Sequence, residues 1–120
     1  MTGGWNTLAE QRQDRLQRVA EAGLGRQVDH GQARALLHAV LQPGDRVCLE
    51  GNNQKQADFL ADTLADLDPA HVHDLHMVQS VLSLPSHLDV FERGIARRLD
   101  FSFSGPQGAR LASLVAEGRI

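Results

Sequence analysis

The sequence predicts an α/β fold, with an open, mostly parallel sheet and flanking helices. From residue 46 onward, short apolar runs alternate with stretches whose apolar residues recur at helical spacing. The first run, Val47-Cys48-Leu49, is continuously apolar, as in an interior parallel strand covered on both faces. Two strand-helix-strand units in series favour a parallel sheet with right-handed crossovers.

An amphipathic helix is expected near the start of the chain. Thr7 followed by Glu10 has capping-box spacing, and apolar residues then recur at helical spacing until Gly23. We expect this helix to lie on the surface. Residues 1–28, a helix and a turn, are therefore predicted to stand apart from residues 29–120, the first part of the α/β domain.

A second helix is expected after Asp29, because Gln32 completes another capping box and an apolar stripe continues until Pro43-Gly44. The first strand and its polar loop come next. A third helix carries apolar positions within residues 57–67, and Asp68-Pro69 closes it with a turn.

Two further strands, residues 72–78 and 99–103, are each followed by a helix. Both of these helices begin with a serine and a capping partner three positions later: Ser86 with Asp89, and Ser104 with Gln107. Gly118 lies where the last helix should end. Because the alternation calls for another strand, we expect the sheet to be incomplete at the C-terminus and the chain to be the first part of something longer.

Composition disfavours several classes of function. The 12 Lys and Arg residues against 15 Asp and Glu residues give a net charge of -3, so nucleic acid is a poor candidate partner. No apolar run approaches the ~20 residues that span a bilayer. The single cysteine, Cys48, excludes an internal disulfide and fits a reducing compartment, so we expect a cytoplasmic protein. Its thiol is expected to be buried and structural.

Polar residues follow each predicted strand, at the edge where open α/β sheets bind ligands. These strand tips are residues 50–54, 79–83 and 104–107. In the first tip Gly51 allows a close turn, and Asn52, Asn53 and Gln54 add hydrogen-bond donors and acceptors. By spacing alone, a plain turn explains this loop as well as a binding site does.

Other residues have simpler explanations. Helix capping accounts for Ser104 better than nucleophilic attack does, because no nucleophile-elbow pattern surrounds it. Glu50 is the one carboxylate at a strand tip, and without a nearby partner it has no assigned catalytic role. The arginines near the third strand indicate a solvated charged face that could also meet a phosphate or a carboxylate. They are Arg93, Arg97 and Arg98.

The histidines at 71, 73 and 76 invite a metal hypothesis. On a strand, His71 and His73 would share one face while His76 points to the other, so the ligands do not converge. We predict no metal site. Binding through His71, His73 and Asp74 is the weakest alternative.

Long stretches resemble the alpha subunit of malonate decarboxylase. The most extended one is residues 43–60, with the sequence PGDRVCLEGNNQKQADFL. Residues 72–82, 88–96 and 99–106 also look like that subunit. The resemblance covers roughly residues 29–120, and runs of this length are far more specific than a short motif.

This resemblance implies a coenzyme A transferase-like fold. It also implies an activity that exchanges acetyl for malonyl on an acyl-carrier-protein thioester, with malonate consumed and acetate released. The implied partners are the acyl carrier protein and the other malonate decarboxylase subunits. No tightly bound cofactor is expected, because the chain would act on the carrier's dephospho-coenzyme A-type prosthetic group.

The reactive glutamate of the related transferases lies in the later half of the family's chain, so the resemblance implies no catalytic residue here. These 120 residues alone should be inactive. Residues 51–54 become expected contacts of the prosthetic group, and Gln79, Ser104 and Gly105 expected contacts of the substrate. The alternative is a non-catalytic assembly module, whose sheet edge and helix stripes bury against other subunits.

Overall fold

The structure is a computed structural model of the whole chain, and it describes residues 3–50 and 57–120. The chain divides into two compact units, residues 1–41 and residues 42–120. The separation of residues 1–28 from residues 29–120 stays a prediction.

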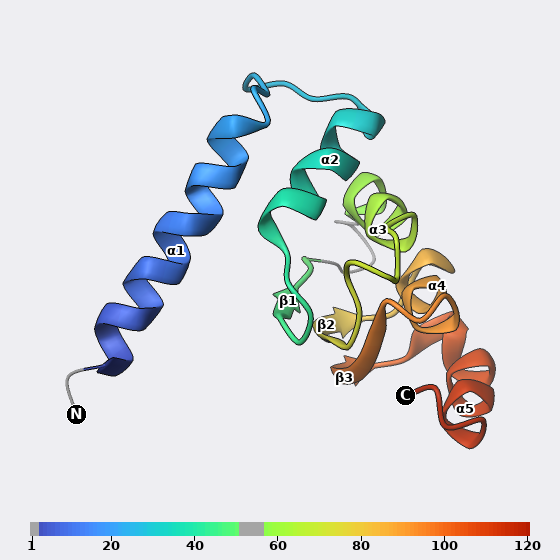
Figure 1. Cartoon of the computed structure of the whole chain (residues 1–120). Coiled ribbons are helices and arrows are strands. Elements are labelled where there is room, and N and C mark those ends of the chain that lie inside the picture. The colour runs from blue at the N-terminus through green and yellow to red at the C-terminus, as the bar shows by residue number, and fades with distance from the viewer. Residues whose placement is uncertain (1–2, 51–56) are drawn as a thin grey trace. The chain divides into compact units, whose positions relative to one another are not determined.

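The first unit contains two helices, α1 (Gly3–Glu21) and α2 (His30–Val40) (Figure 1). The predicted start of α1 at Thr7 is wrong, since helical backbone already begins at Gly3. Most side chains of α1 are exposed, as expected for a surface helix. The Nε of Arg18 donates a hydrogen bond to the carbonyl oxygen of Ala39 (2.8 Å) and joins the two helices.

The capping box before α2 is confirmed. The Oδ1 of Asp29 accepts a hydrogen bond from the backbone N–H of Gln32 (2.8 Å), and the Oε1 of Gln32 accepts one from the backbone N–H of Asp29 (2.9 Å). Two backbone donors that the first turn cannot satisfy internally are thereby paired.

The second unit is built on a parallel sheet with the strand order β1-β2-β3, which confirms the predicted α/β class. The strands are β1 (Arg46–Cys48), β2 (Leu75–Val81) and β3 (Ala96–Phe103). β2 begins later than predicted, because the backbone N–H groups of His71 and Val72 both donate to the carbonyl oxygen of Asp68 in a turn. Asp74, with φ of 55°, then redirects the chain into the strand.

Helices lie together on one side of this sheet (Figure 1). They are α3 (Asp58–Ala65), α4 (Ser86–Glu92) and, after a short 3₁₀ turn, η1 (Gly105–Gln107), α5 (Gly108–Ala116). Because the strands advance in one direction, right-handed crossovers place both connecting helices on the same face. The core lies between this face and the helices, and its fully buried side chains include Leu75, Met77, Leu88, Phe91 and Ile95.

Two of the predicted helix caps are wrong. Pro85, with φ of -54° and ψ of -37°, already has helical backbone before α4, so Ser86 lies inside the helix and caps nothing. Ser104 precedes η1 and makes no side-chain capping bond either. The predicted end of the last helix at Gly118 is confirmed, since this glycine has φ of 74° just after α5.

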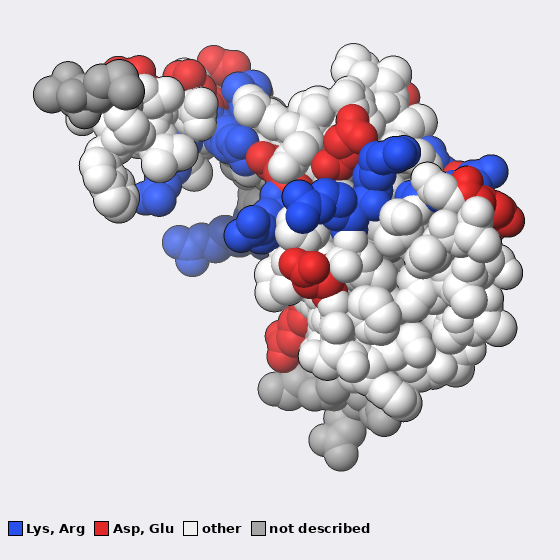
Figure 2. Space-filling view, turned by 90° about the horizontal axis from the view of Figure 1, so that it is seen from below, with Lys and Arg blue, Asp and Glu red and all other residues white. Residues whose placement is uncertain are grey.

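β1 is parallel as predicted, but the prediction of an interior strand covered on both faces is wrong for the residues that the structure describes. β1 forms one edge of the sheet, and its Arg46 and Cys48 are exposed. Figure 2, seen from below Figure 1, shows several Arg side chains at the surface of the second unit. Within the second unit, the described helices α3, α4 and α5 lie on the other face of the sheet.

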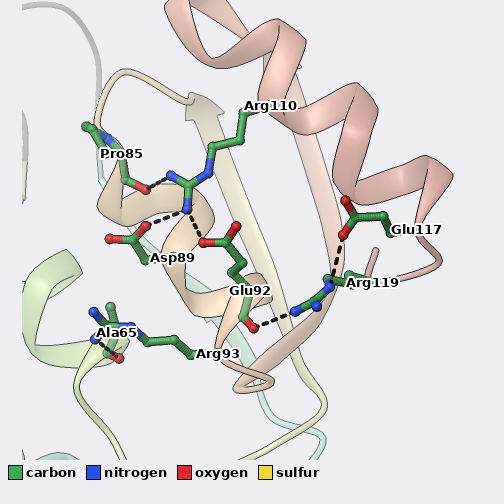
Figure 3. A network of polar contacts seen from close by, with 8 residues as sticks. All are labelled: Ala65, Pro85, Asp89, Glu92, Arg93, Arg110, Glu117 and Arg119. Carbon is green, nitrogen blue, oxygen red and sulfur yellow. Dashed lines mark hydrogen bonds and ion pairs between the residues drawn. The ribbon is translucent and has the colours of Figure 1, made fainter.

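A polar network joins α5 to α4 (Figure 3). The Nη2 of Arg110 lies 2.6 Å from the Oδ1 of Asp89 and 2.7 Å from the Oε2 of Glu92, and its Nη1 donates to the carbonyl oxygen of Pro85 at 2.9 Å. The hydrogen bond that Arg110 donates to Asp89, followed by smaller effects of Glu92, raises the pKa of Arg110, and burial opposes this shift. Arg93 is exposed, as predicted for a solvated charge, and its Nη1 also donates a hydrogen bond to the carbonyl oxygen of Ala65 (2.7 Å).

Candidate functional site

A hollow of about 500 Å³ lies at the carboxyl ends of the three strands. Its lining residues are Cys48, Leu49, Glu50, Val78, Gln79, Ser80 and Ser102. Ligands of open α/β sheets bind at this edge, and the volume falls within the ~300–1,000 Å³ range of small-molecule sites. The sequence predicted this edge as the location of the site.

Gln79 is the predicted site residue that lines the hollow. The residue is only 5% exposed, its side chain shares the face of β2 that carries Leu75 and Met77, and neither its Nε2 nor its Oε1 has a hydrogen-bond partner among the described residues. Each unsatisfied polar atom of this kind costs ~1–3 kcal/mol. A carboxamide can donate and accept at once, so it suits a ligand that carries a carbonyl oxygen or an amide N–H.

His87 is a second buried polar residue near this edge, and sequence reasoning missed it. Its Nδ1 accepts a hydrogen bond from the backbone N–H of Leu84 (3.2 Å), so its Nε2 carries the proton of the neutral ring. In the part of the chain that the structure describes, that Nε2 has no hydrogen-bond partner, nor does the Oγ of Ser83. Burial lowers the pKa of His87, and the nearby charge of Asp62 opposes that shift. The feature of the sequence that could have indicated His87 is its position as a polar residue in the first turn of a helix that follows a strand tip.

The other predicted contact residues are not among the described residues that line the hollow. Residues 51–54 lie outside the described residues. Ser104 and Gly105 are half-buried and are not among the residues that line the hollow. Gly105 has φ of 56°, and a Cβ there would lie 3.7 Å from the carbonyl oxygen of Leu82, so its position serves a tight turn.

Cys48 and Glu50 share the wall of the hollow with Gln79. Both are exposed, which makes the prediction of a buried structural thiol wrong. The apolar pattern around Cys48 predicted coverage on both faces, but burial requires an element packed against the strand. Glu50 keeps no assigned catalytic role.

The histidines of the sequence hypothesis each face a different carboxylate. The pairs are His71 with Asp68 at 3.8 Å, His73 with Asp74 at 2.7 Å and His76 with Asp100 at 2.8 Å. The placement of His71 and His73 on a strand is wrong, since both precede β2. Within residues 3–50 and 57–120, no three metal-ligating side chains come together.

Comparisons with known proteins agree with the fold. The family described as malonate decarboxylase, alpha subunit, transporter, matches residues 4–120. A relative from Malonomonas rubra, acetyl-S-ACP:malonate ACP transferase, is 46% identical over 117 residues, which make up 97% of this chain and 21% of the relative. In the part of the chain that the structure describes, no helix is long and apolar enough to cross a membrane.

Two solved structures are similar as well. The malonate decarboxylase alpha subunit from Acinetobacter baumannii is 41% identical, with a TM-score of 0.84 over 94% of this chain and 22% of that one. A Pseudomonas malonate decarboxylase hetero-tetramer in complex with malonate contains a chain that is 50% identical, with a TM-score of 0.89 over 96% of this chain and 21% of that one. This chain thus spans about a fifth of the length of the relatives it matches. Its sequence from residue 4 to residue 120 places it in the malonate decarboxylase alpha subunit family.

Proposed function

We propose that this chain forms part of the site at which an alpha subunit exchanges acetyl for malonyl on the thioester of an acyl carrier protein. The hollow at the carboxyl edge would hold the acyl-thioester end of the carrier's dephospho-coenzyme A-type prosthetic group. The name of the Malonomonas rubra relative supports the reaction class. The observation that carries the site is that Gln79 belongs to the residues lining the hollow, while its side-chain Nε2 and Oε1 have no hydrogen-bond partner among the described residues.

In this proposal the side chain of Gln79 turns toward the hollow, so that its Nε2 donates a hydrogen bond to a carbonyl oxygen of the acyl thioester and its Oε1 accepts one from an amide of the prosthetic arm. Both polar atoms are then paired. Binding thereby removes the free-energy cost of leaving them without hydrogen bonds. No described residue is assigned as the nucleophile. The chain is therefore expected to bind acyl carrier protein, the proposed partner, without turning it over.

The test is a titration of the chain with acetyl-carrier protein, read by calorimetry. Gln79→Met keeps the side-chain volume and removes both polar atoms, so binding should weaken roughly tenfold, or ~1.4 kcal/mol. The same substitution should raise the free energy of unfolding, because two unpaired buried atoms disappear. The matched control is Gln107→Met, which lies outside the hollow. Unchanged affinity in Gln79→Met would contradict the assignment.

Acyl exchange is followed by mass spectrometry with acetyl-carrier protein and malonate. We expect none from these 120 residues. Full exchange by the chain alone would show that it contains the nucleophile. Asn53→Ala should also reduce carrier binding if residues 51–54 contact the prosthetic group, and an unchanged affinity would count against that loop. A cytoplasmic location is part of the proposal, because a single unpaired cysteine fits a reducing compartment.

A second candidate function is assembly without catalysis. Helix α1 exposes large apolar side chains, with Trp5 at 87%, Leu8 at 61% and Leu16 at 56%. Exposed apolar surface of this kind marks interaction sites, and the Pseudomonas relative is a hetero-tetramer. Persistent self-association in light scattering, relieved by Trp5→Ser with Leu8→Ser, would favour this function. A well-behaved monomer disfavours it.

A further inference from the structure

Two polar atoms outside the hollow are buried without a hydrogen-bond partner among residues 3–50 and 57–120. They are the Oγ of Ser83 and the Nε2 of His87, and neither residue lines the hollow. His87 is 2% exposed, and an unpaired buried polar atom costs ~1–3 kcal/mol. A ligand that accepts hydrogen bonds from both atoms therefore removes this cost.

The two atoms belong to the same turn, which joins β2 to α4. Ser83 directly precedes Leu84, and the backbone N–H of Leu84 donates to the Nδ1 of His87 (3.2 Å). The backbone N–H of His87 in turn donates to the carbonyl oxygen of Leu84 (3.0 Å). These bonds hold the imidazole against the turn and leave the proton of the neutral ring on Nε2. Burial lowers the pKa of His87, against the opposing charge of Asp62, so Nε2 stays a neutral donor at neutral pH.

A neutral imidazole N–H and a hydroxyl group suit an uncharged acceptor. The pair itself contains no cation, and the charge that acts on His87 is the carboxylate of Asp62 in α3. Both facts disfavour an anion such as free malonate, because it would lose water without gaining an opposite charge. A carbonyl oxygen has two lone pairs and can accept from both donors at once. The chemistry therefore favours an amide or thioester carbonyl.

The pair lies further along the tip of β2 than the hollow does. Gln79 and Ser80 line the hollow, and Ser83 follows three positions after Ser80, or ~10 Å along an extended chain. The strand ladder continues in that direction, since the backbone N–H of Leu82 donates to the carbonyl oxygen of Phe103 (3.2 Å). A long acyl arm that enters the hollow at one end can therefore contact the pair at another point.

We propose that Ser83 and His87 form a donor pair for an amide carbonyl of the prosthetic arm whose acyl end lies in the hollow. This role rests on the proposed function, which supplies an arm with a thioester and amide groups. Gln79 contacts the arm near the thioester, and the pair contacts it further from the acyl group. Because free acetate and malonate contain no amide, the pair distinguishes an acyl group on a carrier from the free acid.

The imidazole of His87 reports directly on this contact. Long-range proton–nitrogen NMR of the chain follows its Nε2–H while acetyl-pantetheine, ethyl thioacetate or malonate is added. Acetyl-pantetheine, which has amides, should shift this signal and slow the exchange of its proton with water at least ~10-fold. No response to acetyl-pantetheine would overturn the proposal. An equal response to ethyl thioacetate would overturn the choice of an amide, and a response to malonate would overturn the choice of an uncharged group.

Removal of one donor measures its effect on affinity. Ser83→Ala should weaken the binding of acetyl-pantetheine roughly three- to tenfold, because one hydrogen bond is lost, and should leave the binding of ethyl thioacetate within about twofold. The matched control is Ser113→Ala, which removes the hydroxyl of an exposed serine in α5 and should change neither affinity. Equal affinities of Ser83→Ala and Ser113→Ala for acetyl-pantetheine would refute the donor pair.

Pantetheine without an acyl group separates this proposal from the proposed function. It should still shift the Nε2–H signal of His87 in the Gln79→Met variant, because the amide remains and only the contact near the thioester is removed. A response of His87 combined with unchanged acetyl-carrier binding in Gln79→Met would contradict the assignment of Gln79 alone. Weakened carrier binding in Gln79→Met combined with a silent His87 would overturn the donor pair alone.

Discussion

Replacing Arg110 by methionine should loosen α5 from α4 by about 2 kcal/mol of unfolding free energy. Methionine keeps most of the side-chain volume and removes the guanidinium group. The contacts of the side chain with Asp89, Glu92 and the carbonyl oxygen of Pro85 are all made by the guanidinium group, as Figure 3 shows. The change therefore removes three contacts between the two helices without opening a large cavity.

The magnitude follows from the exposure of each partner. The side chains of Arg110 and Asp89 are 28% and 30% exposed, so we assign that pair ~1 kcal/mol after discounting for solvent. The Glu92 side chain is 52% exposed and adds less than ~0.5 kcal/mol. The hydrogen bond from the charged guanidinium group to the backbone oxygen of Pro85 contributes ~1 kcal/mol, below the ~1.5–3 kcal/mol of a typical charged bond because it is exposed to solvent.

Urea unfolding followed by circular dichroism measures the loss, and Arg97→Met is the matched control. Arg97 is an exposed arginine on β3 without an ion pair in the described residues, so its replacement should change stability by less than ~0.5 kcal/mol. A double-mutant cycle with Asp89→Asn should give a coupling of ~1 kcal/mol. Equal stabilities of Arg110→Met and Arg97→Met would refute the reasoning.

Three further predictions concern the core, a helix cap and a buried histidine. Leu75→Ala should lower the free energy of unfolding, measured by calorimetry, by ~2–5 kcal/mol, because Leu75 is 0% exposed on the helix-covered face. A loss no larger than that of an ordinary surface substitution would contradict this prediction. Asp29→Ala should weaken α2 by ~1 kcal/mol, seen as faster hydrogen exchange in its first turn, whereas Asp29→Asn should retain most of the protection. Stability should fall as the pH drops below the ordinary histidine pKa of ~6.5, because the unfolded chain protonates while His87, with its lowered pKa, stays neutral. His87→Gln should flatten this part of the pH profile of urea unfolding, and an unaltered profile would exclude His87 as its source.

Short sequence patterns predicted the structure correctly where the residues within one turn decide it by themselves. The capping box of Asp29 and Gln32 was predicted correctly because both hydrogen bonds close within one turn. The same spacing at Ser86 failed because Pro85 already has helical backbone, and a spacing rule contains no information about that residue's dihedral angles. The polar edge of the sheet was predictable, since chain order places the strand tips together.

The sequence by itself determined the parallel α/β arrangement, the strand tip that contains Gln79 and, through its long similar stretches, the family. Tertiary structure decided which side chains are covered. It left the amide of Gln79 and the Nε2 of His87 buried without partners among residues 3–50 and 57–120, and it left Cys48 exposed. The physical reason is that periodicity records the environment a side chain is suited to, whereas burial depends on which other elements pack against it.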